Sequence, residues 1–188
     1  MLVLILGLAI FVGVHSVRML APGYRNMQIA ANAGRWRALY SLASIVGVVL
    51  IVWGWALYRP EAPELYSPPD WSRHVAAALV PLAFIFLFAA YSVAGRIKAT
   101  LKHPFLTAVI LWAVAHLIAN GDLASVILFG SFLAYATVNR IAVRTRPNPN
   151  PAFVSYRGDL IAVVAGVAAT ALFFFWLHAL LFGVSPLG

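Results

Sequence analysis

Apolar residues in this chain fall into six runs of helical length, separated by polar, basic or proline-rich stretches. The runs cover residues 1–20, 38–58, 75–95, 104–119, 123–138 and 160–184. A helix of about 20 apolar residues spans the hydrocarbon core of a bilayer, and the two shortest runs, at about 1.5 Å per residue, are about 24 Å long. We therefore predict an all-α membrane protein with six transmembrane helices in one bundle, forming a single domain over residues 1–188.

The composition supports this fold class and narrows the chemistry. Of the 188 residues, 63% are hydrophobic and 10% are charged, a balance typical of a protein with several membrane spans. The chain has no cysteine, which excludes a disulfide, a thiolate metal ligand and a cysteine nucleophile. Any metal chemistry must therefore use histidine or carboxylate side chains.

The basic residues are distributed unevenly among the connections between the apolar runs. The formal charge is +8. All Lys and Arg residues except two fall in connections on one side of the membrane, and the two exceptions, Arg59 and Arg73, fall on the other side. Because basic loops stay in the cytoplasm, we predict a multi-pass protein of the bacterial inner membrane with both termini on the periplasmic side. We therefore expect the protein to interact with the lipid bilayer and not with nucleic acid.

Four connections carry residues that break or start helices. We expect loops at residues 21–37, 59–73 and 139–158, the last with a flexible proline-rich segment at 147–151. Asn120-Gly121-Asp122 predicts a tight turn, in which Gly121 is the C-cap of one helix and Asp122 the N-cap of the next.

His116 lies inside the fourth apolar run, about 18 Å from the start of that run at about 1.5 Å per residue. An ionisable side chain in hydrocarbon is costly, so it marks a functional site by default. Neutral imidazole is also the commonest metal ligand among side chains. The residue alone leaves two interpretations open: a metal or haem ligand, or a core histidine bonded to a neighbouring helix.

His15 lies near the cytoplasmic end of the first run, one turn before Arg18. A group bound at His15 could place an anionic substituent, such as a haem propionate, against Arg18, Arg96, Lys98 or Lys102. The alternative is that His15 extends to the interface. His15 would lie about 10 Å below the cytoplasmic surface and His116 about 8 Å deeper. Two ligands of one iron must lie closer together in depth, so these estimates alone do not favour an iron bound by both histidines.

The other histidines have simpler interpretations. His103, beside Lys102 and before Pro104, is expected to cap the start of a helix, with a contact to a cofactor or phosphate as the functional alternative. His74 and His178 are expected at the membrane interface. No G-x-S-x-G, glycine-rich phosphate loop or H-E-x-x-H motif occurs, so no catalytic residue is assigned.

Several strings resemble the NnrU family of membrane proteins. They are His15-Ser16 with Arg18, Gly34 to Leu42, Trp71 to His74, Ile97-Lys98 through His103-Pro104, and Ala115 to Ser125. The last string, A-H-L-I-A-N-G-D-L-A-S, is specific, and the match covers nearly the whole chain. The resemblance implies a role in nitric oxide metabolism and denitrification, in support of the nitrite and nitric oxide reductases.

The family is in turn similar to zeta-carotene isomerase, a haem b membrane enzyme of plants and cyanobacteria. The H-S motif of the isomerase falls on His15, and its C-x-x-H motif falls on Ala113 and His116. The resemblance therefore implies haem b with His15 and His116 as iron ligands, and Arg18, Lys98, Lys102 and His103 as further cofactor-binding residues. Ala113 stands where the isomerase has its cysteine, which counts against ligand-switching isomerase chemistry.

Two alternatives to haem binding remain. Lys102-His103-Pro104 resembles the R-H-P motif of membrane methyltransferases of the isoprenylcysteine carboxyl and phospholipid type, which implies S-adenosylmethionine and a lipophilic substrate. The glutamates expected downstream of that motif are missing after the fifth run. The other alternative is a non-catalytic assembly factor. We expect nitric oxide or a lipophilic small molecule as the ligand, and the sequence leaves a homo-oligomer open.

Overall fold

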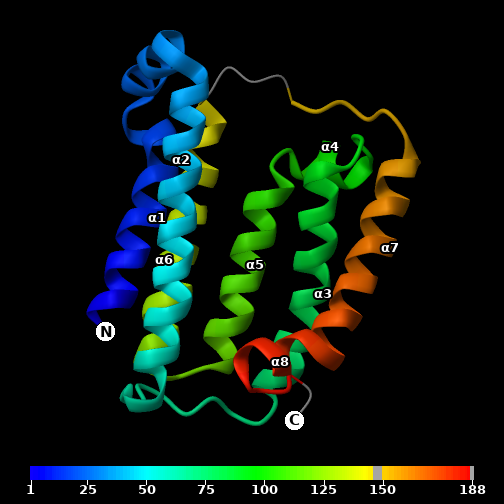
Figure 1. Ribbon diagram of the computed structural model, residues 1–188. Coiled ribbons are helices and arrows are strands. Elements are labelled where there is room, and N and C mark those ends of the chain that lie inside the picture. The colour runs from blue at the N-terminus through cyan, green and yellow to red at the C-terminus, as the bar shows by residue number, and fades with distance from the viewer. Residues whose placement is uncertain (146–149, 187–188) are drawn as a thin grey trace. The chain divides into compact units, whose positions relative to one another are not determined.

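The computed structural model describes residues 1–145 and 150–186, and the regular elements in these ranges are helices (Figure 1). Five helices are long and apolar enough to cross a membrane: Leu2–Leu20, Pro22–Glu61, Ser72–Tyr91, Leu123–Ala142 and Tyr156–Phe182. Pro104–Ala119 is a shorter apolar helix. The prediction of a helical membrane protein is confirmed at this level.

The chain divides into two compact units, and the single domain over residues 1–188 stays a prediction. The first unit contains Met1–Tyr66 and Asp122–Tyr135, and the second contains the other described residues. Each histidine with a candidate functional role can therefore be placed among the neighbours of its own unit.

In the first unit, helices α1 (Leu2–Leu20) and α2 (Pro22–Tyr58) pack along one another (Figure 1). Two glycines of α2 allow the close approach. A Cβ added to Gly47 would lie 2.9 Å from the Cβ of Phe11, and one added to Gly54 would lie 2.7 Å from the Cα of Leu4. These distances leave no room for a larger side chain, as is usual where membrane helices pack through small residues.

Helix α2 begins earlier than predicted, because Pro22 suits its first turn. The backbone leaves helical geometry inside α2 at Asn32, with φ −162° and ψ 97°. The side-chain oxygen of Asn32 accepts a hydrogen bond from the N–H of Arg35 at 2.9 Å, which is the geometry of an N-cap and restarts the helix. The expected loop at residues 21–37 is therefore wrong.

Helix α6 (Leu123–Ala142) begins as predicted, with Asp122 as its N-cap. The Oδ1 atom of Asp122 accepts a hydrogen bond from the N–H of Ser125 at 2.8 Å. The loop between α2 and α3 also contributes, since the N–H of Leu123 donates to the carbonyl of Pro63 at 2.9 Å and Glu64 forms an isolated antiparallel bridge with Asp122.

The predicted glycine C-cap is wrong. Helix α5 (Pro104–Ala119) ends with Asn120 as its C-cap in an extended conformation, at φ −133° and ψ 120°. Its side-chain amide donates to the carbonyl of His116 at 2.9 Å, so an asparagine closes the helix without a left-handed residue.

In the second unit, α3 (Ser72–Tyr91) contacts both α5 and α7 (Tyr156–Leu172), as Figure 1 shows. Gly166 of α7 brings the main chains together, because an added Cβ would lie 2.7 Å from the Cα of Ile85. Helix α7 begins four residues before the predicted start at Leu160, since Ser155 caps it by accepting a hydrogen bond from the N–H of Arg157 at 3.2 Å.

The short helix α4 (Arg96–Leu101) is held by side chains from later in the sequence. The carboxylate of Asp159 accepts hydrogen bonds from the N–H groups of Arg96 and Ile97 at 2.7 and 3.0 Å. At the other end of the helix, the guanidinium of Arg140 donates to the carbonyl of Leu101 at 2.9 Å. Helix α4 is therefore fixed at both ends by distant parts of the chain.

The last apolar run is one interrupted helix. Helix α7 passes through a π-helical turn, η3 (Phe173–Leu177), into α8 (His178–Phe182), which ends at Gly183 with φ +70°. The loop expected at residues 139–158 is shorter than predicted, because α6 continues to Ala142 and the 3-10 turn η2 occupies Val143–Thr145. Residues 147–149 of its proline-rich segment lie outside the described residues.

Candidate functional site

His15 lies on α1 among aromatic rings from three helices of the first unit. Its Nδ1 atom is 2.7 Å from the carbonyl oxygen of Phe11, and the Phe11 ring stacks on the imidazole with centroids 4.1 Å apart. Tyr40 of α2 and Tyr135 of α6 approach with ring centroids at 5.1 and 6.3 Å. The close contact of Gly47 with Phe11 holds this stack in place from the side of α2.

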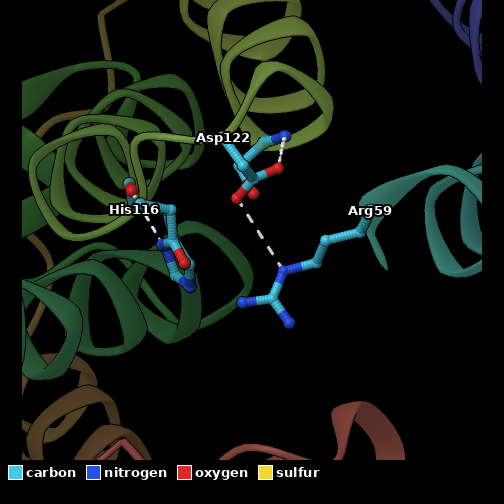
Figure 2. Close-up of polar contacts among 5 residues, drawn as sticks. Arg59, His116 and Asp122 are labelled. Carbon is cyan, nitrogen blue, oxygen red and sulfur yellow. Dashed lines mark hydrogen bonds and ion pairs between the residues drawn. The ribbon is translucent and has the colours of Figure 1, made fainter. Parts of the chain in front are cut away.

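His116 lies on α5 in the second unit, one turn before the helix ends. Its Nδ1 atom is 2.7 Å from the carbonyl oxygen of Trp112, a contact drawn as a dashed line in Figure 2. The Trp112 ring lies 5.1 Å from the imidazole between centroids. Two small neighbours, Ala113 and Ala115, have no exposed surface. His116 is thus fixed by its own helix in tightly packed surroundings.

Both imidazoles make the same hydrogen bond, and this bond determines the proton position in the neutral ring. A carbonyl oxygen can only accept, so Nδ1 carries the hydrogen in both histidines. The lone pair of each neutral ring is then on Nε2. A histidine that ligates a metal almost always donates its other ring N–H to a carbonyl, carboxylate or water, which fixes the tautomer and increases ligand basicity. Both side chains therefore fit the role of an iron ligand.

Of the cations expected near a cofactor, Lys98 is already engaged within the second unit. Its Nζ atom donates to the carbonyls of Ala90 and Ser92 at 2.8 and 2.9 Å, which closes the end of α3. Lys98 is therefore better placed to stabilise the turn after α3 than to hold a propionate.

Arg18 and Lys102 have exposed side chains and can meet an anionic group at the membrane surface. Lys102 also has a positive φ of 61°, which turns the chain between α4 and α5. His103 occupies the N-cap position of α5 and Pro104 follows at the helix start, but the His103 side chain makes no capping hydrogen bond. Its second predicted role, a contact to a cofactor or phosphate, stays a prediction.

His178 lies in the same unit as His116, at the start of the short helix α8. Its Nδ1 atom is 2.7 Å from the carbonyl oxygen of Val184, which the turn at Gly183 brings back toward α8. The sequence predicts His178 at the membrane interface, and this placement stays a prediction. Among the described residues, no group of three or more His, Asp or Glu side chains forms a metal site.

An ion pair joins the turn after α2 to the start of α6 in the first unit. The Nε atom of Arg59 lies 3.8 Å from Oδ2 of Asp122, as Figure 2 shows, and the guanidinium lies 5.0 Å from the centroid of the Trp55 ring. Burial raises the pKa of Tyr66, and the Asp122 carboxylate adds to this effect, so the phenol stays protonated at neutral pH. Asp122 is thus a helix cap and a partner of Arg59, in agreement with its predicted structural role.

The sequence did not single out Tyr40 or Tyr135. Tyr40 falls in the string Gly34 to Leu42 that carries part of the family resemblance, so that string was a usable signal. Tyr135 has no such signal, because only the fold brings α6 to α1. The structure adds both phenols to the surroundings of His15.

Comparison with known proteins gives one match. The family model described as "NnrU protein" matches residues 3–186, which is nearly the whole chain. No curated protein and no solved structure matches the chain significantly.

Proposed function

The chain belongs to the NnrU family, and from this premise we propose that it binds haem b in the bacterial inner membrane, with His15 and His116 as iron ligands. Its role is in nitric oxide metabolism, in support of the nitrite and nitric oxide reductases of denitrification. The proposed topology has six spans, with the shorter helix Pro104–Ala119 as one of them and both termini in the periplasm.

The observation that carries this proposal is the matched hydrogen bond of the two histidines. Each donates Nδ1–H to the carbonyl four residues earlier at 2.7 Å, so the helix itself orients the ring. These two bond to their own helix through Nδ1, which leaves Nε2 as the nitrogen with the lone pair.

Bound haem would supply an iron that binds small diatomic ligands and changes oxidation state. The chain's own residues would contribute orientation, charge and the exclusion of water. His15 and His116 hold their rings in the ligating tautomer, and the apolar helices keep water away. Arg18 and Lys102 are exposed and can pair with carboxylate substituents at the membrane surface.

The test is a visible spectrum of the detergent-purified protein from haem-supplemented cells, oxidised and dithionite-reduced. We expect a Soret band with sharp α and β bands in the reduced protein, and loss of this six-coordinate spectrum in His15→Ala and in His116→Ala. His74→Ala is the matched control, because His74 is exposed at the start of α3 and should leave the spectrum unchanged.

A colourless wild-type protein would overturn the proposal. Binding of S-adenosylmethionine by such a protein would then favour the methyltransferase interpretation. Co-purification with a reductase and no cofactor would favour an assembly factor.

A further inference from the structure

Arg96, in the second unit, has its guanidinium held against two aromatic rings from a later part of the chain. Its Cζ atom lies 5.0 Å from the centroid of the Phe153 ring and 6.0 Å from that of the Tyr156 ring. The two rings lie 4.8 Å apart between centroids. Stacking on an aromatic face orients a guanidinium and leaves its N–H groups able to donate to an anion.

The backbone on both sides of this contact is fixed by hydrogen bonds and close packing. The N–H groups of Val154 and Ser155 both donate to the carbonyl of Ala94, at 2.8 and 3.3 Å. A Cβ added to Gly158 would lie 2.9 Å from the carbonyl carbon of Val93, so the main chains touch there. The position of the Arg96 side chain therefore depends on the tertiary fold of the second unit.

The charge of Arg96 is left without a carboxylate partner in the part of the chain that the structure describes. Asp159 lies close by, but its two oxygens accept from the main-chain N–H groups of Arg96 and Ile97. Arg59 shows the contrast, because it also lies 5.0 Å from an aromatic ring but has an ion pair with Asp122. Arg96 is exposed, so its charge is available to an external anion.

The surface around Arg96 is apolar and lies where two candidate spans end. Helix α3 ends at Tyr91, shortly before Arg96, and the last span begins at Tyr156. The ends of spans lie at the membrane–water interface, beside the lipid headgroups. Val93 and Val154 are exposed there together with both rings. A phospholipid offers a phosphate to the guanidinium and an acyl chain to the apolar side chains.

We infer that Arg96, Phe153 and Tyr156 form a binding site for the headgroup of an anionic phospholipid. The guanidinium donates to the phosphate, and the two rings keep the guanidinium in place. Val93 and Val154 contact the start of the acyl chain. Basic side chains at a membrane surface attract anionic lipids, and this site does not depend on the proposed haem binding.

The experiment is native mass spectrometry of the detergent-purified full-length protein, titrated with phosphatidylglycerol or with phosphatidylcholine of the same acyl chains. We expect the wild-type protein to prefer phosphatidylglycerol. Arg96→Gln should lower the affinity for phosphatidylglycerol by about 5-fold and leave that for phosphatidylcholine unchanged. This variant should fold, because Asp159 bonds to the main chain of Arg96 and not to its side chain.

A second variant tests the rings separately from the charge. Phe153→Leu combined with Tyr156→Leu keeps apolar side chains and the arginine but removes the aromatic faces, so the affinity for phosphatidylglycerol should fall by about 2- to 5-fold. Arg59→Gln is the matched control, because it removes an arginine with the same kind of ring contact and an ion pair of its own. It should bind phosphatidylglycerol as the wild-type protein does.

Three results would overturn the inference. The first is equal affinity of the wild-type protein for the two lipids, and the second is an equal loss of phosphatidylglycerol binding in Arg96→Gln and Arg59→Gln. The third is displacement of the lipid by inorganic phosphate at matched ionic strength, which would make free phosphate the occupant. A changed visible spectrum of Arg96→Gln with unchanged lipid binding would also overturn it and assign Arg96 to a propionate.

Discussion

The two intramembrane histidines make the same bond in different surroundings. His15, in the first unit, lies among Phe11, Tyr40 and Tyr135 from three helices, whereas His116, in the second unit, lies beside Trp112 of its own helix. The comparison shows that an apolar helix can set the tautomer of a histidine by itself. At His15 the neighbouring helices α2 and α6 add the rings of Tyr40 and Tyr135.

The largest expected effect comes from a change that disturbs the surroundings of His15 alone. Gly47→Leu would place a side chain against Phe11, whose ring stacks on His15. Forcing extra volume into such a contact costs about 1–3 kcal/mol. We expect a lower thermal unfolding midpoint and a perturbed His15 site, measured by unfolding in detergent and by the visible spectrum.

Gly13→Leu provides the control for Gly47→Leu, since no atom lies within 4 Å of the Cβ that it would add. Equal destabilisation by the two changes would contradict the role given to Gly47.

A smaller effect is expected in the second unit from Asp159→Ala. The substitution removes the acceptor for two N–H groups at the start of α4, and loss of a helix cap costs about 1 kcal/mol. Hydrogen exchange should increase at Arg96 and Ile97 while the spectrum stays that of the wild type. Asp70→Ala, at an exposed carboxylate in the loop before α3, should leave both the hydrogen exchange and the spectrum unchanged.

The smallest effect is expected from Arg59→Gln. Its ion pair with Asp122 has an Nε to Oδ2 distance of 3.8 Å, and the Arg59 side chain is 33% exposed, so the pair should contribute less than about 1 kcal/mol. The unfolding midpoint should fall slightly at low salt, and the difference from wild type should shrink as salt is added. A large, salt-independent loss would instead indicate that the contact with the Trp55 ring dominates.

Much of the fold was predictable from the sequence because it depends on local patterns. The apolar runs identify the helices, Asp122 caps α6 and Pro104 begins α5 as expected. The predictions were wrong at two residues that usually interrupt or end a helix. Pro22 begins a helix in place of a loop, and Asn120 replaces Gly121 as a cap.

Of the candidate site, only the two candidate iron ligands could be predicted from the sequence. His15 and His116 stand out as ionisable residues in apolar runs. Their neighbours do not, because Tyr40 and Tyr135 meet His15 through helix packing. In the second unit, Asp159 likewise reaches the start of α4 from more than 60 residues away.

The central claim is that the Nε2 atoms of His15 and His116 bind iron, and imidazole rescue tests it most directly. His15→Gly and His116→Gly are purified from haem-supplemented cells, and imidazole is titrated into each while the visible spectrum is followed. The account predicts that each variant loses the six-coordinate spectrum and regains it with imidazole, whereas His178→Gly keeps the wild-type spectrum throughout. A wild-type spectrum in either His15→Gly or His116→Gly before imidazole is added would contradict the account.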